Sequence, residues 1–512
     1  MTDSKIERLK SGGQPRVLDL FSGCGGISLG FNLAGCNIIG GVESDRHAAQ
    51  SHADNFHRTD PKHLIHAQAK DVTVTNPYAL LESYGYDDPE NSVDILVGGP
   101  PCPAFARVGR AKLREVNEHP EAFRQDPRAK LYLPYLDYVS KLRPVALLME
   151  NVPDILNFGG HNLGEEICEI LEEELGYTCT YTLLNSANYG VPQMRERFFL
   201  VAIRSDIATE YKFPLPTRKV DFPQGYMGSR QVALKFTEPN GLFHKSHFQP
   251  TPQASADCPP PVTVREAIED LPEIFGHLTG TIKRGARRFD KYVGYRSDTD
   301  ISSYAQFMRS WPGFESTGKL WDHVIRSLSE RDYRLFRSMS PNDDYPKAHA
   351  LANRLFEDAL AEMKHNGNGM TNDTTRYDKL KALYVPPYDP GKFPNKWRKM
   401  EPSEPARTLM AHLGKDSYSH IHYDSAQARV LSVREAARLQ SFPDGFAFSG
   451  TMNPAFRQIG NAVPPLLSFV LSVSILNTIY SHLDYQYVDR LCENLPESLF
   501  NLYTTSPESW GQ

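Results

Sequence analysis

The sequence predicts an α/β protein built on a mostly parallel sheet, with a second, irregular region inserted into it. Over about the first 200 residues, short apolar β-rich runs alternate with helical stretches, a pattern typical of a parallel sheet with helices on both faces. Proline and glycine become frequent after Arg204, and the alternation stops until about Leu431. A helical pattern and a long apolar run then follow.

The first expected strand is the buried run at residues 17–21, followed by a glycine cluster and a helix-like run at 27–34. Four further apolar runs, each ending at a polar residue or at Gly and Pro, are the remaining expected strands: residues 37–42, 93–97, 145–149 and 198–203. Ligands of such sheets bind just past the carboxyl ends of the strands. The residues that follow these runs are therefore the first candidates for a functional site.

The change in texture along the chain predicts four segments. The main domain begins with residues 1–204 and returns at 431–480, the inserted domain covers 205–430, and residues 481–512 form a tail. The whole chain has a formal net charge of -6, but the segment 205–430 holds 32 Lys and Arg against 28 Asp and Glu. That segment therefore carries +4 and the remainder -10. Charge alone leaves open whether this reflects a polyanion partner or ordinary solvated loops.

Composition excludes several classes of protein. We find no run of about 18 apolar residues and no apolar N-terminal stretch, so we expect neither a membrane span nor an export signal. Seven scattered cysteines do not form a disulfide framework. There is no Cys-x-x-Cys pair, and His420 and His422 lack partners at ligand spacing, so we expect no metal. These observations predict a cytoplasmic protein with reduced thiols.

The sequence FSGCGG at 21–26 joins an expected strand to an expected helix. Glycines such as Gly23 and Gly25 let the backbone approach a ligand closely, and a helix N-terminus offers N–H groups to an anion. Glu43 lies about twenty residues further on, where a carboxylate can accept hydrogen bonds from ribose hydroxyls. Asp71 is a weaker candidate for contacting an adenine. These residues fit NAD, FAD or S-adenosylmethionine, and a plain tight turn is the alternative.

The sequence GGPPC at 98–102 presents one cysteine after two glycines and two prolines. A thiolate is a nucleophile, and a helix N-terminus or an arginine lowers the pKa of a thiol. Cys102 is therefore a candidate nucleophile, with a small buried thiol as the alternative. Glu150 ends the run 145–149 and should share the sheet edge with Cys102. A carboxyl in a poorly solvated pocket has a raised pKa and can hold or donate a proton.

The segment GVPQMRER at 190–197 precedes the last apolar run. Arg195 and Arg197 share one face if this stretch is extended. They can hold a carbonyl oxygen or a phosphate, and a structural ion pair is the alternative.

Taken in order, eight motifs resemble those of one family: FSGCGG, VESD, KDV, GGPPC, ENV, LNSANYGVPQMRER, REAARLQSFPD and QIGNAVPP. In this combination the sequence resembles the DNA (cytosine-5) methyltransferases, over about residues 1–204 and 404–475. The resemblance implies a Rossmann-like α/β methyltransferase domain that depends on S-adenosyl-L-methionine. It also implies that residues 205–430 are an inserted, irregular target-recognition domain.

The resemblance implies a role for each matching residue. Cys102 would attack C6 of a flipped-out cytosine, Glu150 would hold the N3/N4 edge of the base, and Arg197 would contact its O2. Arg195 and Gln193 would shape the pocket. The activated C5 would then accept a methyl group from S-adenosyl-L-methionine. The residues implied to line the cofactor site are Phe21, Gly23, Gly25, Glu43, Asp71 and Asn461.

The implied partner is double-stranded DNA, read in its major groove by residues 205–430, with Trp397 and its basic neighbours as candidate contacts. We expect a monomer in the cytoplasm, associated with the nucleoid through DNA, and a restriction or defence protein as a possible companion. Two departures from the family pattern, Pro103 and Ala106, lie in the loop expected to close over the DNA.

Two other functions stay open. A tRNA cytosine-5 methyltransferase of the same fold would have a short recognition region and a Cys-Phe-Thr signature where this chain has Ser-Phe-Pro at 441–443. A catalytically silent DNA-binding module is the alternative suggested by Pro103 and Ala106.

Overall fold

The computed structural model describes residues 3–101, 132–158, 161–237, 246–282, 289, 291–367, 375–415, 418–483, 487, 491 and 495–502, to which the statements below apply. It contains a six-stranded sheet in the order β2-β1-β3-β4-β7-β5. The strands are β1 (Arg16–Leu20), β2 (Asn37–Val42), β3 (Ile95–Gly98), β4 (Ala146–Asn151), β5 (Tyr177–Asn185) and β7 (Glu196–Arg204).

The sheet is mostly parallel, as the sequence predicts. Strands β1 to β4 are parallel to one another, whereas β7 runs antiparallel to both β4 and β5. All five expected strands are present. The sixth, β5, was not predicted, although its alternation of Tyr and Thr is typical of a strand.

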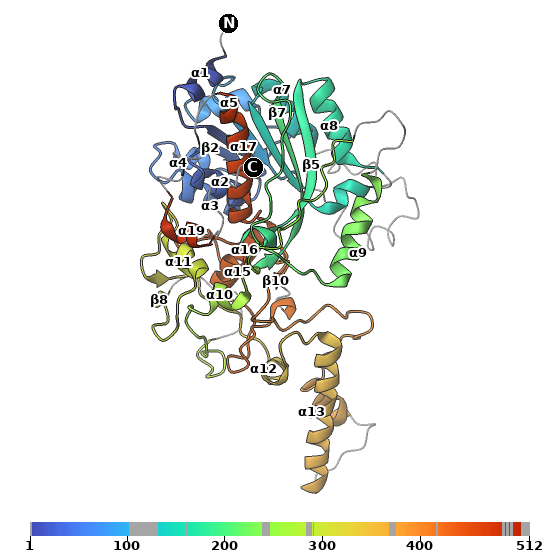
Figure 1. Ribbon diagram of the computed structural model, residues 1–512. Coiled ribbons are helices and arrows are strands. Elements are labelled where there is room, and N and C mark those ends of the chain that lie inside the picture. The colour runs from blue at the N-terminus through green and yellow to red at the C-terminus, as the bar shows by residue number, and fades with distance from the viewer. Residues whose placement is uncertain are drawn as a thin grey trace.

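Successive side chains along the strands point to opposite faces of the sheet, and they contribute to two separate hydrophobic core layers. On one face lie α2 (Gly26–Leu33) and the long α17 (Pro465–Ser481), which pack against each other (Figure 1). The other face is covered by α5 (Pro77–Ser83), α7 (Tyr132–Leu142) and α8 (Leu163–Glu173). The chain thus has helices on both faces of its sheet, and residues after 431 complete the same layer as residues near 30.

The helices from Met452 to Ser481 bear on the expectation that no segment spans a membrane. By length and composition this stretch, α16 (Met452–Asn461) and α17, is apolar enough to cross a membrane. However, 94% of its most apolar window is buried inside the protein. These two helices therefore belong to the core of the α/β domain.

Residues 205–430 divide between two cores. The helices α10 (Val264–Ile268) and α11 (Ser303–Ser310) pack into the main core beside α15 (Val433–Leu439). The helices α12 (Glu330–Ser338) and α13 (Tyr345–His365) belong to a separate small core, and α13 projects at the end of the molecule opposite the N-terminus (Figure 1). The expected domain boundaries stay a prediction.

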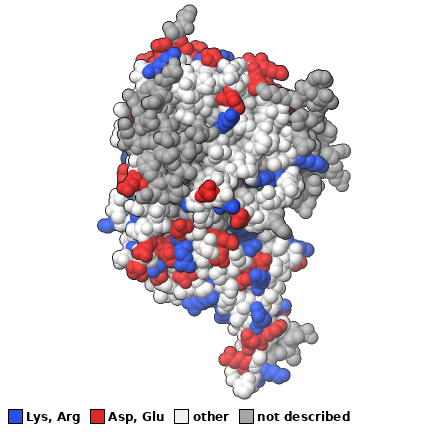
Figure 2. All heavy atoms as spheres, in the orientation of Figure 1, with Lys and Arg blue, Asp and Glu red and all other residues white. Residues whose placement is uncertain are grey.

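Trp397 belongs to this small core and not to a surface. It is 1% exposed and stacks on the ring of Tyr418 with centroids 5.1 Å apart, with Phe336 and Tyr345 on other sides. Its candidacy as a DNA contact is therefore wrong, because an aromatic residue beside basic ones in the sequence can still be an anchor of the core. On the face shown in Figure 2, basic and acidic side chains mingle over this end of the molecule, so its net charge of +4 is not gathered there into one basic patch.

The remaining described elements are α1 (Ser4–Lys10), α3 (Arg46–Phe56), α4 (His63–His66), η4 (Pro153–Asn157), η5 (Ser186–Tyr189), β6 (Gln193–Met194), α9 (Gln224–Ala233), η6 (Leu234–Phe236), β8 (Val293–Gly294), β9 (Lys319–Leu320), α14 (Thr375–Ala382), β10 (Ala406–Arg407), η7 (Tyr418–His420) and α19 (Glu497–Leu502).

Candidate active site

A cavity of about 620 Å³ opens past the carboxyl ends of β1 to β4. This is the place where an α/β sheet binds ligands, and the volume suits a small molecule. The predicted site residues that line it are Phe21, Gly23, Glu43, Asp71, Glu150, Arg195, Arg197 and Asn461. Gly25 and Gln193 do not line it. Cys102, like Pro103 and Ala106, lies outside the described residues, two positions beyond the cavity residue Pro100.

Glu43 forms one end of the cavity at the carboxyl end of β2. One carboxylate oxygen accepts the backbone N–H of Gly23 at 3.0 Å, and the other accepts that of Asp45 at 2.7 Å. Burial raises the pKa of Glu43, and these two N–H groups oppose the rise. The carboxylate is thereby fixed in direction, while lone pairs remain for hydroxyl groups of a ligand.

Asp71 sits at the same end but in a different environment. It is exposed, and the backbone N–H and hydroxyl of Thr73 donate to one oxygen at 2.9 and 2.7 Å. These hydrogen bonds lower the pKa of Asp71. Asp71 is therefore ionised and available as an acceptor for an amino group.

Gly25 shapes the turn before α2 and does not line the cavity. Its φ of 103° lies in the left-handed region, where it is the N-cap of α2. A Cβ there would stand 2.4 Å from the ring of Phe56, so a side chain is excluded by packing. The prediction of a direct cofactor contact at Gly25 receives no support from this geometry.

The same wall carries the observation that tests whether a cofactor fits. The hydroxyl of Ser22 is buried, lines the cavity and has no hydrogen-bond partner among the described residues. Asn461, at the end of α16, presents an exposed amide to the same space. Together with the start of α2 and the Glu43 carboxylate, these groups fit a ligand that has both an amino-acid end and a ribose.

Glu150 stands at the other end of the cavity, where β3 and β4 finish side by side. A Cβ on Gly99 would lie 2.9 Å from one oxygen of Glu150, so glycine at that position makes room for the carboxylate. The side-chain amide of Asn151 donates to the carbonyl of Pro100 at 3.0 Å. Gly99 therefore leaves room for the Glu150 carboxylate, and Asn151 ties the end of β4 to the segment that follows β3.

Glu150 is paired with Arg197, whose Nε lies 3.0 Å from its Oε1. Burial raises the pKa of Glu150, and the positive charges of Arg197 and Arg195 oppose the rise. Both side chains of the pair keep a small exposed fraction, 12% and 15%, on the cavity side. A carboxyl in this balance can take up a proton when a base edge approaches.

Arg195 is buried beside this pair with its hydrogen bonds incomplete. One Nη donates to the carbonyl of Leu409 at 3.1 Å, while Nε is buried without a partner among the described residues. Burial and the charge of Arg197 lower the pKa of Arg195. The cavity thus combines the fixed carboxylate of Glu43 at one end with a carboxyl and two guanidinium groups at the other.

A model of the C-5 cytosine-specific DNA methylases matches residues 15–477. The chain belongs to this family. It is a DNA (cytosine-5)-methyltransferase with a Rossmann-like domain, as the sequence motifs imply.

Similar proteins cover the methyltransferase almost from end to end. A protein of Oceanobacillus iheyensis that bears the name of a type II methyltransferase is 38% identical over 468 residues, which cover 91% of this chain and 96% of the relative. The type II methyltransferase M.AgeI of Thalassovita gelatinovora is 29% identical over 481 residues, covering 90% and 99%. A solved Escherichia coli structure described as a prophage-encoded DNA modification methyltransferase has a TM-score of 0.56 at 21% identity, covering 92% of this chain and 100% of its own. That last likeness concerns the fold alone.

Gln193 of the methyltransferase lies behind the cavity wall. It is fully buried, and its side-chain amide bonds the backbone N–H of Leu409, the carbonyl of Leu439 and the side chain of Gln440. The structure therefore does not bring the predicted substrate-binding amide to the cavity.

Sequence reasoning missed two parts of this wall. The backbone of residues 409–411 lines the cavity, and Arg457 pairs with Asp45 across it, with Nη2 and Oδ2 2.5 Å apart. Arg457 directly precedes QIGN, so its position in the motif was an available signal. Residues 409–411 carry no such signal, because they contribute mainly backbone.

A histidine cluster of the methyltransferase bears on the expectation that no metal is present. Among the described residues, ligand atoms of His57, Asp60 and His66 lie within 4.8 Å of one another. Burial lowers the pKa of His57 to about 3 and that of His66 to about 4. However, the two imidazole rings are stacked with centroids 3.7 Å apart and planes 8° apart, so their in-plane lone pairs run side by side and do not converge. The absence of a metal stays a prediction.

Proposed function

We propose that this methyltransferase methylates C5 of cytosine within a specific double-stranded DNA sequence, through a covalent bond between Cys102 and C6 of a flipped-out base. One observation carries the proposal: Glu150, Arg195 and Arg197 share a single cavity with Glu43 and the start of α2. A base bound to the first group is thereby placed next to a cofactor bound to the second. The position of Cys102 itself rests on its place in the sequence.

The residues divide the chemistry as follows. The Cys102 thiolate adds to C6, and the electron pair displaced from the ring makes C5 nucleophilic. Glu150 protonates or hydrogen-bonds N3 as negative charge develops there, which its raised pKa favours. Arg197, with Arg195 behind it, stabilises charge at O2. After the methyl group is bonded to C5, the C5 proton leaves, the electrons reform the ring double bond and the C6–S bond breaks.

The same cavity supports S-adenosyl-L-methionine as the cofactor. Glu43 would bind the ribose hydroxyls, Asp71 the adenine amino group, and the Ser22 hydroxyl and Asn461 amide the methionine end. When bound, this cofactor supplies an electrophilic methyl group on a sulfonium centre. The protein's own contribution is to hold the two reactants at opposite ends of one enclosed space.

Base flipping follows from the depth of the site. Glu150 and Arg197 are 12% and 15% exposed, so they cannot reach a cytosine that is stacked inside a duplex. Extruding the base costs a few kcal/mol, which contacts in the pocket offset.

The relatives support a role in restriction–modification. Two of them bear names of type II methyltransferases and match this chain over about nine-tenths of its length. We infer that the DNA of the host cell is the substrate and that a restriction or defence enzyme acts on the same sequence.

The test is methyl transfer from labelled S-adenosylmethionine to duplex DNA, followed by bisulfite sequencing of a methylation-free genome in which the protein is expressed. We expect conversion-resistant cytosine at one recurring sequence. Cys102→Ser should abolish turnover, and a duplex with 5-fluorocytosine at the target should form a denaturant-stable adduct with the parent only, because fluorine cannot leave as a proton does.

Two results would overturn the proposal. Full activity in the Cys102→Ser variant would remove the covalent step. Transfer to tRNA alone, or DNA binding with no transfer at all, would instead favour one of the two alternatives that the sequence left open.

A further inference from the structure

Two glutamines meet in the core directly behind the cavity. The side-chain amide of Gln193 donates to the side-chain oxygen of Gln440 and to the carbonyl of Leu439 at 3.1 Å. Gln440 in turn donates from its own amide to the carbonyl of Ala462. Both glutamines are 0% exposed. The two amides form one continuous hydrogen-bonded bridge with no water-accessible atom.

Each end of this bridge reaches a different end of the cavity. The oxygen of Gln193 accepts the backbone N–H of Leu409 at 2.9 Å, and the carbonyl of that same residue accepts from Arg195 at 3.1 Å. At the other end, Ala462 directly follows Asn461 on the cofactor wall. A continuous path of hydrogen bonds therefore runs from Leu409, beside Arg195, through two amides to the backbone beside Asn461.

The bridge is also fastened to the adjoining helices. Gln440 ends α15, and Ser441 follows with a φ of 63°, a left-handed conformation that costs a non-glycine residue about 1 kcal/mol. The Ser441 hydroxyl accepts the backbone N–H of Leu466 at 3.1 Å, in the first turn of α17. This contact with α17 accounts for a serine at a position where a glycine would relax the backbone.

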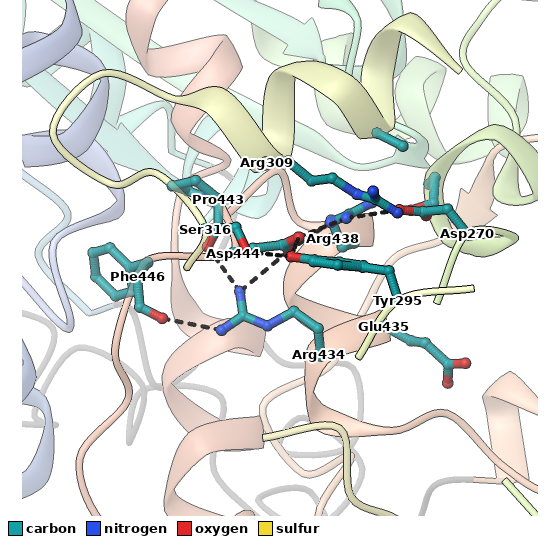
Figure 3. A network of polar contacts seen from close by, with 12 residues as sticks. Asp270, Tyr295, Arg309, Ser316, Arg434, Glu435, Arg438, Pro443, Asp444 and Phe446 are labelled. Carbon is teal, nitrogen blue, oxygen red and sulfur yellow. Dashed lines mark hydrogen bonds and ion pairs between the residues drawn. The ribbon is translucent and has the colours of Figure 1, made fainter. Parts of the chain in front are cut away.

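Both ends of α15 are anchored to the region 205–430. Arg434 in the first turn donates to Asp322 at 2.9 and 2.7 Å, and Arg438 in the last turn contacts Asp270 at 3.2 Å. Arg438 also contacts Asp444, which follows the helix, at 2.6 Å. Figure 3 shows that both guanidinium groups point toward Asp444 from the same helix. Through α15, the bridge is thus connected to the segment 205–430, which the family resemblance implies to be the target-recognition domain.

We propose that Gln440 is a positioning residue that couples occupation of the base end of the cavity to binding of the cofactor at the other end. The inference rests on the proposed function. A neutral amide suits this task because it donates at one end and accepts at the other. An apolar side chain of similar size would leave the Ala462 carbonyl and the Gln193 amide without these partners in a dry core.

A purely structural role predicts something different. If Gln440 only stabilised the fold, its loss would weaken cofactor binding by the same factor whether or not DNA is present. Coupling between two sites is instead measured by the ratio of the two affinities, and typical couplings are about 5-fold to 150-fold.

The experiment measures the dissociation constant of S-adenosylhomocysteine by calorimetry on the full chain. It is made with and without a duplex that carries the methylation site found by bisulfite sequencing. In the parent we expect the duplex to tighten binding at least about 5-fold. Gln440→Met should reduce that ratio to nearly one. Gln193→Met breaks the same bridge from its other side, because it removes the donor to the Gln440 oxygen, so it should give the same loss.

The matched control is Gln306→Met on α11, an exposed glutamine away from the cavity, which should keep the parent's ratio. A thermal melt of each variant identifies any that fails to fold, and Gln193→Met then decides. A parent ratio of one, or the parent's ratio in a folded Gln440→Met or Gln193→Met variant, would overturn the coupling. Failure of the proposed function shows differently, as a parent that transfers no methyl group.

Discussion

Two buried arginines of this methyltransferase differ in how far their hydrogen bonds are completed. Arg434 in α15 makes two contacts with the carboxylate of Asp322 and a third with the carbonyl of Pro443 at 2.7 Å. Burial lowers the pKa of Arg434, but the charges of Asp322 and Asp444 outweigh it and raise the value. Arg195 in the cavity has one carbonyl partner, a buried Nε without a partner among the described residues, and a lowered pKa.

This difference in hydrogen bonding distinguishes buried charges that stabilise the fold from buried charges that belong to the site. Where a buried charge is completely paired, it fixes the fold, as the network around α15 does (Figure 3). Where a buried charged side chain next to a cavity lacks some of its hydrogen-bond partners, a ligand can supply them. Groups perturbed in this way mark functional sites. Substitutions in the two sets should therefore affect different quantities.

The largest expected effect is on the rate of reaction. Glu150→Gln keeps the shape of the side chain but removes its ability to exchange a proton. We expect the rate of methyl transfer to fall by about 10²-fold to 10⁴-fold. Urea unfolding should change by only about 1 kcal/mol, because the amide oxygen of a glutamine can still accept a hydrogen bond from Arg197. Initial rates with labelled S-adenosylmethionine check the predicted fall in the rate of methyl transfer. An unchanged rate would show that Glu150 takes no part in the chemistry.

The next effect is on stability. Arg434→Met leaves the Asp322 carboxylate buried without its partner, which typically costs about 3–5 kcal/mol in the free energy of unfolding. Urea denaturation followed by circular dichroism measures it.

Two controls sharpen this second comparison. Replacing both partners, Arg434→Met with Asp322→Leu, should recover part of the loss, since an apolar pair leaves no unpaired charge. Arg195→Met should cost far less stability than Arg434→Met and should instead slow methyl transfer, by about 10²-fold as for the loss of one oxyanion donor. Equal losses of stability at Arg195 and Arg434 would contradict the division into site and scaffold.

The smallest effect is the pH dependence of stability. It has opposite signs for Glu150 in the cavity and for Glu435 in the network around α15. Burial raises the pKa of Glu150, so its contribution is fully present below about pH 4.5 and is lost as the pH rises through its native pKa. Burial also acts to raise the pKa of Glu435, but Arg429 and His422 hold it far below its ordinary value. The contribution of Glu435 is therefore present above about pH 4.5 and is lost as the pH falls.

Unfolding free energies between pH 4 and pH 8 test this for the parent, Glu150→Gln and Glu435→Gln. The stability of the parent relative to Glu150→Gln should decrease with rising pH, whereas its stability relative to Glu435→Gln should increase. Parallel curves for the two variants would mean that the two carboxyls share one environment.

Much of the candidate site could be predicted because it depends on strand ends. Glu43, Glu150 and the sequence GGPPC each follow an apolar run, and parallel strands bring their carboxyl ends to one edge whatever the rest of the chain does. Gln193 and Trp397 could not be placed in this way. Each belongs to a motif or a basic stretch that suggests a ligand, yet the side chain of each points into a core formed by residues distant in the sequence.

The sequence by itself determined five of the six strands of the main sheet, the residues at their ends and the family, because periodicity, turn glycines and motif order are local properties of a chain. Only the tertiary structure decided which polar groups remain incomplete. Arg195 and Arg434 are the same amino acid in similar runs of charge. Their difference arises because Asp322 reaches one of them across more than a hundred residues, while the hydrogen-bond partner of the other among the described residues is a backbone carbonyl.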